Sequence, residues 1–91
     1  MSKFAVLTTF TSEALRDQHR PAHRAHLKHL VDQGSLLLAG PFEDEESGGL
    51  LVFEAESADA VQAMMDADPF STGGVFASVR IRPFKQVAPE A

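Results

Sequence analysis

Ninety-one residues are enough for one domain with a single core and leave no room for a second. The chain has no cysteine, which excludes disulfides, thiolate metal sites and thiol catalysis. Its net charge of −5 argues against nucleic acid as a partner, because phosphate binding needs a clustered positive surface.

The N-terminal segment resembles a strand rather than a signal peptide. No apolar run approaches the roughly 20 residues that span a bilayer. We therefore expect a cytoplasmic protein with no membrane partner.

Four strands and two helical regions are predicted in the order β-α-β-β-α-β. Alternating β-forming residues predict the first strand, and short apolar runs bounded by turn residues predict others. Apolar residues that share one helical face predict the helices. This order is the ferredoxin-like α+β arrangement, in which a four-stranded antiparallel sheet carries both helices on one face. We expect strands at 4–10, 35–39, 50–55 and 75–84, helices at 21–34 and 57–68, and a frayed tail at 86–91 that ends a single domain spanning 1–91.

Pro21 is expected to open the longer helix. Its ring fixes φ near the helical value, and its missing N–H is not needed in a first turn. Only a short helical turn around Leu15 is expected before it. The helix would end at Gly34 as its C-cap. This start places His23 in the first turn and leaves His19 outside the helix.

Two predicted strand segments, 36–39 and 50–53, are apolar on both faces. Two helices cover only one face of a sheet, and a monomer seldom leaves an apolar patch of that size in water. The sheet of a second copy would cover the other face. We therefore expect a homodimer with sheets packed face to face, a dimeric α+β barrel.

His23 and Asp68 are the first candidates for chemistry. A neutral imidazole held by a carboxylate is the simplest proton-transfer device that a protein builds without a cofactor. His23 shares the apolar stripe of its helix with Leu27 and Leu30, so it faces the core or a pocket. Asp68 precedes Pro69 at a helix C-terminus, where an anion costs roughly 0.3–1 kcal/mol and a histidine N–H would compensate. From the residues alone, a buried structural histidine fits this pattern as well as a catalytic one.

Positive charge recurs every four residues at Arg16, Arg20, Arg24 and Lys28. A solvated helix face explains this row most simply. An anion-steering rim for a carboxylate or phenolate substrate is the alternative. Arg20 is accordingly a candidate substrate-binding residue, with a surface salt bridge as its other role.

Ser71, Thr72 and Arg80 are weaker candidates for ligand binding. Ser71 and Thr72 follow Pro69, where a turn over 71–74 is the simpler explanation. Arg80 alternates with apolar residues on the last strand, so it would line the dimer cavity or reach solvent.

A metal site is the competing interpretation. His19, His23 and His26 lie at i, i+4 and i+7, and they would converge on one ion if the helix ran unbroken. Because Pro21 is expected to interrupt that helix, we expect no metal, and no motif indicates an organic cofactor. The acidic run at 43–46 is expected to form an exposed hairpin tip.

Four short segments carry a family resemblance: Arg20-Pro21-Ala22-His23, Gly34-x-Leu36-Leu37-x-Ala39-Gly40-Pro41, Asp68-Pro69-Phe70 and Arg82-Pro83-Phe84. Together they resemble the YCII-related (YciI-like) family over nearly the whole chain. The resemblance implies a ferredoxin-like dimer of the α+β barrel type, with His23 and Asp68 as an active-site pair. A few members of that family act in the breakdown of aromatic compounds, including removal of chloride from a chlorinated hydroxyquinol, and the wider fold includes muconolactone isomerases.

Two hypotheses of function follow. In the first, the protein is an enzyme that uses His23 and Asp68 for general acid–base chemistry of the lyase, isomerase or dehydrochlorinase type. Its substrate would be a small oxygenated compound, such as an aromatic one. In the second, the protein is a non-catalytic ligand-binding or accessory homodimer in which the same pair is structural.

Overall fold

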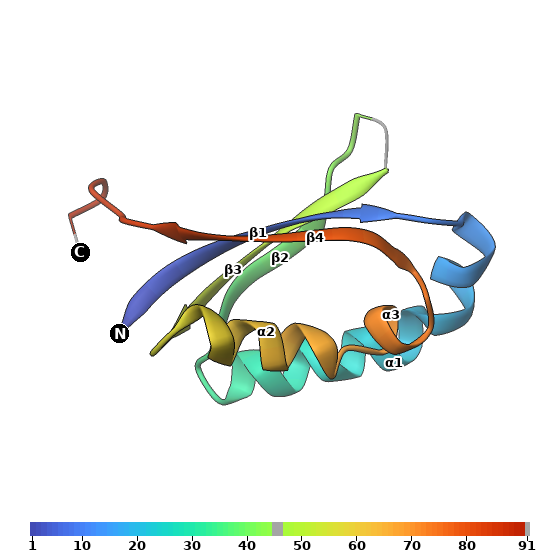
Figure 1. The fold of residues 1–91 in the computed structure, drawn as a ribbon, viewed down its shortest axis with the longest axis horizontal. Coiled ribbons are helices and arrows are strands. Elements are labelled where there is room, and N and C mark those ends of the chain that lie inside the picture. The colour runs from blue at the N-terminus through green and yellow to red at the C-terminus, as the bar shows by residue number, and fades with distance from the viewer. Residues whose placement is uncertain (45–46, 91) are drawn as a thin grey trace.

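The computed structural model describes residues 1–44 and 47–90, so part of the predicted acidic tip lies outside the described residues. Four antiparallel strands form one sheet in the order β2-β3-β1-β4, and the helices cover one face of it (Figure 1). The ferredoxin-like α+β prediction is therefore confirmed. The strands are β1 (Ser2–Phe10), β2 (Leu36–Pro41), β3 (Gly48–Ala55) and β4 (Phe76–Phe84), and the helices are α1 (Glu13–Asp32), α2 (Ala58–Asp66) and α3 (Pro69–Thr72).

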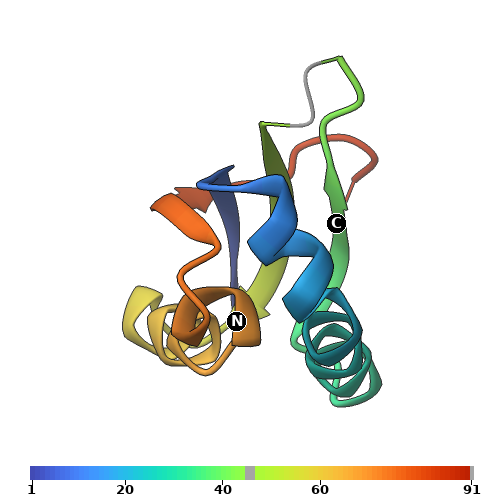
Figure 2. The same ribbon diagram turned by 90° about the vertical axis from the view of Figure 1, so that its right-hand side faces the viewer.

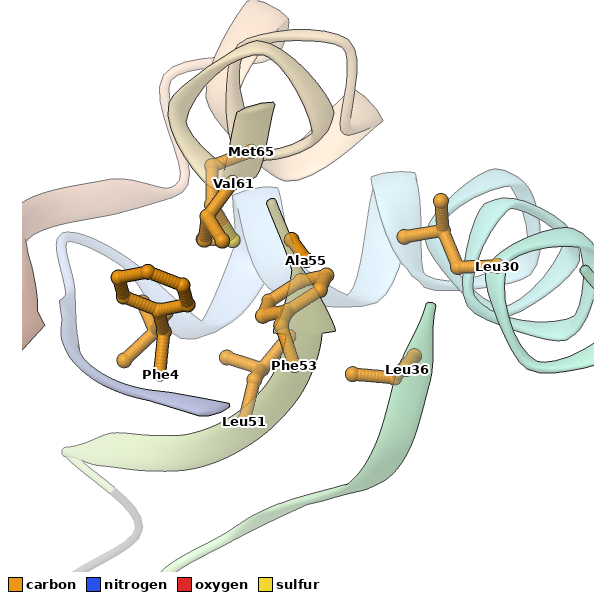
Figure 3. Packing of buried hydrophobic residues seen from close by; sticks show 9 residues of the cluster. Phe4, Leu30, Leu36, Leu51, Phe53, Ala55, Val61 and Met65 are labelled. Atoms are coloured by element: carbon orange, nitrogen blue, oxygen red, sulfur yellow. The ribbon is translucent and has the colours of Figure 1, made fainter. Parts of the chain in front are cut away.

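The core lies between the helices and the inner face of the sheet. Side chains alternate across a strand, so Phe4 and Val6 of β1 share this face with Phe53 of β3. Val61 and Met65 of α2 close over Phe4 and Phe53 (Figure 3). All five side chains are at most 5% exposed. Full burial of one such side chain stabilises the fold by about 1.5–3 kcal/mol.

The strand ends lie within two residues of the predicted ends. At the start of β3 the difference is the glycine pair Gly48 and Gly49, which looks like a turn in the sequence but belongs to the strand. A Cβ atom on Gly48 would collide with the Thr8 carbonyl, and one on Gly49 would lie 2.8 Å from the carbonyl oxygen of Gly40. These glycines therefore allow the neighbouring strand backbones to approach.

The break predicted at Pro21 was wrong, because α1 runs unbroken from Glu13 to Asp32 with Pro21 inside it. The Ser12 side chain caps the helix by accepting the backbone N–H of Leu15. A proline inside a helix removes one hydrogen bond and bends the helix rather than always ending it. Figure 2 accordingly shows the first turns of α1, in blue, set at an angle to the rest of the helix, in teal.

The C-terminal end of α1 lies next to Gly34, where the sequence predicted that the helix ends. Gly34 has φ of +83° and follows the C-cap residue Gln33. The backbone N–H of Ser35 donates to the Leu30 carbonyl, and that of Gly34 donates to the Val31 carbonyl. This pair of bonds is the Schellman motif, which needs a residue with positive φ at this position.

The segment after α2 also differs from the prediction. In place of a turn over 71–74, residues 69–72 form the short helix α3. Asp68 was predicted at a helix C-terminus, but its side chain caps the N-terminus of α3 by accepting the Phe70 backbone N–H at 2.9 Å. An aspartate followed by proline suits the N-cap and first position of a new helix. The carboxylate therefore lies at a favourable helix end.

The outer face of the sheet carries apolar side chains that the helices do not cover. Leu7 pairs with Leu50 across β1 and β3, and Leu38 on β2 pairs with Val52. Leu7 is 37% exposed and Leu38 is 53% exposed. No helix in the described residues is both long and apolar enough to span a membrane.

Candidate active site

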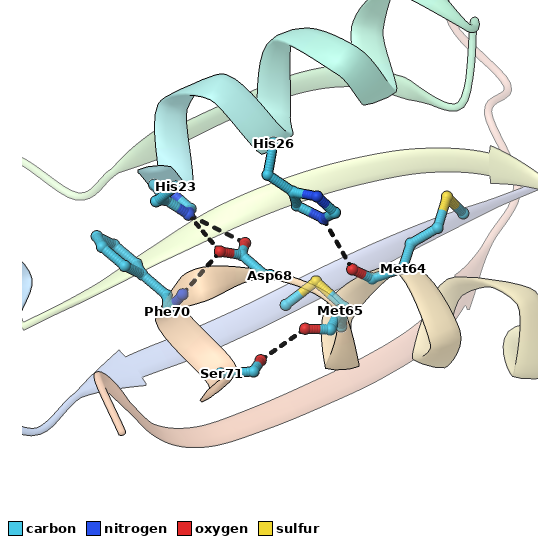
Figure 4. A network of polar contacts seen from close by, with 7 residues as sticks. All are labelled: His23, His26, Met64, Met65, Asp68, Phe70 and Ser71. Carbon is cyan, nitrogen blue, oxygen red and sulfur yellow. Dashed lines mark hydrogen bonds and ion pairs between the residues drawn. The ribbon is translucent and has the colours of Figure 1, made fainter. Parts of the chain in front are cut away.

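A histidine and an aspartate that are 45 residues apart in the sequence meet beneath α1 (Figure 4). His23 Nδ1 lies 2.8 Å from Asp68 Oδ1 and 3.0 Å from Oδ2. The Asp68 side chain is 2% exposed and the His23 side chain 14%. A buried carboxylate needs hydrogen-bond donors, and the imidazole and the Phe70 backbone N–H supply them.

The hydrogen bond to Asp68 fixes which nitrogen of His23 carries the proton. Carboxylate oxygens only accept, so Nδ1 donates. In the neutral ring Nε2 then holds a lone pair. No hydrogen bond to Nε2 occurs among the described residues, and His23 lines a pocket. The arrangement therefore gives the pocket a hydrogen-bond acceptor with a carboxylate behind it.

Two phenylalanines fix the plane of the imidazole. The His23 ring stacks on Phe70 with ring centroids 3.7 Å apart and planes 2° from parallel. Phe76 meets the same ring edge-on at 6.4 Å. His23 itself lies in the middle of α1, not in the first turn that Pro21 was expected to open. The ring is therefore positioned by the aromatic contacts and by the place of His23 in the middle of α1. It does not lie at the N-terminus of the helix.

The connection between α2 and α3 is tied down by two further polar contacts (Figure 4). The Ser71 hydroxyl donates to the Met65 carbonyl at 2.6 Å. His26 Nε2 donates to the Met64 carbonyl at 3.0 Å. These bonds hold the loop that presents Asp68 against α1.

The pocket beside His23 has a volume of about 450 Å³ and lies between α1 and the inner face of the sheet. Phe10, Phe70 and Phe76 form an aromatic wall, and Thr8 and Leu51 contribute from the sheet. The opposite edge is built from small residues: Ala39, Gly40, Pro41 and Gly49. This volume lies within the range of small-molecule binding sites.

Three of the four cations in the predicted row line this pocket: Arg16, Arg20 and Arg24. Arg20 also forms an ion pair with Asp17 at 2.6 Å, which is the salt bridge considered for it. Its place in the pocket lining leaves substrate binding by Arg20 as a prediction. The Arg16 guanidinium lies 4.9 Å from the centre of the Phe10 ring. Lys28 lies outside the lining, where its hydrogen bond to Asp32, reinforced by the charge of that carboxylate, raises the pKa of Lys28.

The remaining sequence candidates lie away from the pocket lining. The Ser71 hydroxyl is engaged by the Met65 carbonyl, and Thr72 is exposed at the end of α3. Arg80 pairs with Leu7 in the sheet register and so occupies the outer face, opposite the pocket. Ligand binding by these residues within one protomer has no support from their positions.

The three histidines considered for a metal site point to different partners although α1 is unbroken. His23 is held by Asp68 and His26 by the Met64 carbonyl. The His19 ring packs on Gly73, where an added Cβ would lie 2.6 Å from the ring. Within residues 1–44 and 47–90, no group of three or more histidine, aspartate or glutamate side chains is placed to hold a metal ion.

Phe70 is a site residue that the sequence patterns did not assign. Its backbone N–H donates to Asp68 and its ring stacks on His23, so one residue contacts both members of the pair. The available signal was its position two residues after Asp68, in a segment that also carried the family resemblance.

Sequence comparison identifies related proteins. The model of the YCII-related domain matches residues 2–85. The protein YciI of Escherichia coli O6:H1 is 43% identical over 77 residues, which cover 75% of this chain and 79% of that protein. An uncharacterized protein of Haemophilus influenzae is 34% identical over the same length, with the same coverage of both chains.

Comparison with solved structures points to the dimeric α+β barrel superfamily. The 5-chloro-2-hydroxyhydroquinone dehydrochlorinase TftG of Burkholderia phenoliruptrix AC1100, solved with 2,5-dihydroxybenzoquinone, superimposes with a TM-score of 0.76. It is 27% identical, and the match covers 91% of this chain and 93% of that chain. An antibiotic biosynthesis monooxygenase has a TM-score of 0.60 over 96% of this chain and 99% of its own, but at 15% identity it shares the fold alone.

Proposed function

The chain belongs to the YCII-related domain family, and from this membership and the site geometry we propose that it is a small-molecule enzyme with a His23–Asp68 acid–base pair. The observation that carries the proposal is the 2.8 Å contact between His23 Nδ1 and the buried carboxylate of Asp68, beside a pocket that His23 lines. In this arrangement Nε2 takes a proton from the substrate, and Asp68 orients the ring and stabilises its cation.

The proposed substrate is a small oxygenated ring compound. A pocket of about 450 Å³ with an aromatic wall accommodates one planar ring, because stacked and edge-on contacts with phenylalanine favour such a shape. The likeness to TftG, a dehydrochlorinase solved with 2,5-dihydroxybenzoquinone, supports the same substrate class. Elimination, isomerisation and dehydrochlorination all begin with the removal of one acidic proton.

Dehydrochlorination shows how the pair would act. His23 Nε2 removes a proton from one ring hydroxyl and returns it to the carbon that bears chlorine, which gives a keto tautomer. Nε2 then removes the proton of a second hydroxyl while the carbon–chlorine bond breaks and chloride leaves with the bonding electrons. The product is a hydroxybenzoquinone, and one proton and one chloride ion are released. The scheme needs no oxidant, because the chloride carries away the electron pair.

A structural role for the same pair is the second candidate. Its support is that Asp68 also caps α3, so the carboxylate stabilises the fold even without catalysis. In that case the protein binds a ligand without transforming it. Loss of His23 would then lower the unfolding free energy by about 1–3 kcal/mol, because the buried carboxylate loses its partner. The wild-type protein would show no turnover under this alternative.

Chloride release from 5-chloro-2-hydroxyhydroquinone tests the proposal. His23→Gln is expected to lower turnover by about 10²–10⁴-fold while far-UV circular dichroism remains that of the folded protein. His29→Gln is the matched control, since His29 lies on the same helix but is exposed and outside the pocket lining. Turnover of His23→Gln near the wild-type rate contradicts the catalytic role. A wild-type protein that binds 2,5-dihydroxybenzoquinone but releases no chloride favours the ligand-binding alternative.

Assembly of two copies through the outer face of the sheet is part of the proposal. The exposed leucines Leu7 and Leu38 give that face an apolar character, and the solved neighbours belong to the dimeric α+β barrel superfamily. A second sheet packed face to face would remove these side chains from water. The cytoplasmic location stays a prediction, which cell fractionation checks.

A further inference from the structure

The pocket collects positive charge in a chain that is acidic overall. The sequence has 13 acidic and 8 basic residues, yet the described lining of the pocket contains three arginines and no aspartate or glutamate. Arg16, Arg20 and Arg24 follow one another at intervals of four residues, so they project from one face of α1. One of them, Arg20, is held by Asp17, which lies outside the lining.

The type of cation changes where the row leaves the pocket. The three lining cations are arginines, and the fourth member of the row is Lys28, which pairs with Asp32 at 2.8 Å. A guanidinium presents planar pairs of N–H donors that match two oxygens at once, whereas an ammonium acts as a point charge. The lining therefore suits an anion with paired oxygens better than an isolated charge.

We propose that Arg20 and Arg24, with Arg16 beside them, are the anion-recognition residues of this pocket. The ligand class they select is a small anion with two neighbouring oxygen atoms, either a carboxylate or an ionised dioxygenated ring. This inference rests on the proposed function for the location of the site but not for its chemistry, since charge selection does not require His23 to act as a base. The two ideas therefore fail separately.

Charge selection would also assist the proposed proton transfer. Removal of a hydroxyl proton by His23 leaves an oxyanion in the pocket. Guanidinium groups already in place stabilise that charge without rearrangement, and their effect is larger where water is partly excluded. Arg24 lies next to His23 in the chain and lines the same pocket. An anionic ligand held by Arg24 thus lies beside the histidine.

Calorimetric titration with matched probes tests the inference. The anionic probes are 2,5-dihydroxybenzoquinone and benzoate, and the neutral counterparts are hydroquinone and benzamide. We expect the wild type to bind each anion at least about tenfold more tightly than its neutral counterpart, and to lose affinity as salt is raised. Arg24→Gln is expected to lower the affinity for both anionic probes by about tenfold or more. Lys28→Gln is the matched control, because it removes one charge from the same helix outside the lining.

The outcomes separate the two proposals. Equal binding of anions and neutral probes, absence of anion binding, or wild-type affinity in Arg24→Gln overturns the anion-recognition role. A stronger effect of Lys28→Gln than of Arg24→Gln overturns it as well, since the effect would then be long-range charge alone. Anion binding that survives in His23→Gln, together with absent turnover in the wild type, leaves the anion site standing and rejects the enzyme. Sedimentation of Arg24→Gln as the wild type confirms that its loss of affinity is not a loss of assembly.

Discussion

Phe70 and His23 share one carboxylate and stack on each other. The Phe70 backbone N–H and His23 Nδ1 both donate to Asp68 Oδ1, at 2.9 and 2.8 Å, and the two rings lie 3.7 Å apart with planes 2° from parallel. The start of α3 therefore holds the aspartate and the face of the imidazole together. Any change at Phe70 reaches both members of the pair.

Phe70→Leu tests whether this stacking positions the base. The change removes an aromatic contact worth about 0.5–1.5 kcal/mol in addition to some buried area, so we expect unfolding free energy to fall by about 1–3 kcal/mol. Turnover is expected to fall by about tenfold or more, because the imidazole loses one wall. Phe4→Leu is the control, since Phe4 is buried in the core away from the pocket. Equal turnover losses in the two variants would contradict a positioning role.

Substitutions at Asp68 separate helix capping from orientation of the imidazole. Asn is a good N-cap, so Asp68→Asn is expected to change the unfolding free energy by less than about 1 kcal/mol. The Asn amide, however, offers N–H toward Nδ1, which moves the ring proton to Nε2 and abolishes the base. Turnover should therefore fall by about 10²–10⁴-fold. Asp68→Ala loses the cap as well and should cost a further 0.5–2 kcal/mol or so of stability. Nitrogen-15 NMR of the imidazole reports the tautomer, and an unchanged Nδ1–H tautomer in Asp68→Asn would refute this account.

Pro21→Ala tests the use of the bend in α1. Proline inside a helix costs about 3 kcal/mol, so alanine is expected to raise the unfolding free energy by about 1–3 kcal/mol. Arg16 and Arg20 precede the bend, whereas His23 follows it, and all three line the pocket. A straighter helix would move the guanidiniums relative to the imidazole, so we expect affinity for 2,5-dihydroxybenzoquinone to fall by about fivefold or more even though stability rises.

The control for that variant is Pro83→Ala on β4, a proline that does not line the pocket. It should leave ligand affinity unchanged. If Pro21→Ala binds the ligand as tightly as the wild type, the bend has no role in the site.

The fold was predictable because the first strand alternates at period two and the two longer helices carry apolar stripes. Alternation along β1 puts Phe4 and Val6 on the inner face and Leu7 on the outer face, as the period-two pattern requires. Pro21 misled the prediction, because local preference gave way to the packing of α1 against β2 and α3. Local signals could not show that the helix bends at the proline and continues.

The site was predictable only in part. The apolar stripe predicted that His23 faces the core or a pocket. Its contact with Asp68, however, joins two segments 45 residues apart, and no local pattern fixes such a distance. Asp68 was expected at a helix end and is found at one, although as the N-cap of a four-residue helix too short to show a periodic pattern. The sequence showed that cations recur every four residues, but only the fold shows that the first three of them line the pocket.

Leu7→Lys tests the proposed assembly. Leu7 lies on the central strand β1, paired with Leu50 on one side and Arg80 on the other, and all three belong to the outer face. In a face-to-face dimer a lysine here would be buried without an acidic partner beside Arg80, at a cost of several kcal/mol, so the dimer constant should weaken by more than about 100-fold. Val31→Lys is the matched control, because Val31 is 51% exposed on α1 and outside this face. Sedimentation velocity over a range of concentrations measures the dimer constant of both variants. In a separate protomer the lysine is solvated, so Leu7→Lys should stay folded and sediment as a monomer. A Leu7→Lys variant that sediments like the wild type would place the dimer interface elsewhere.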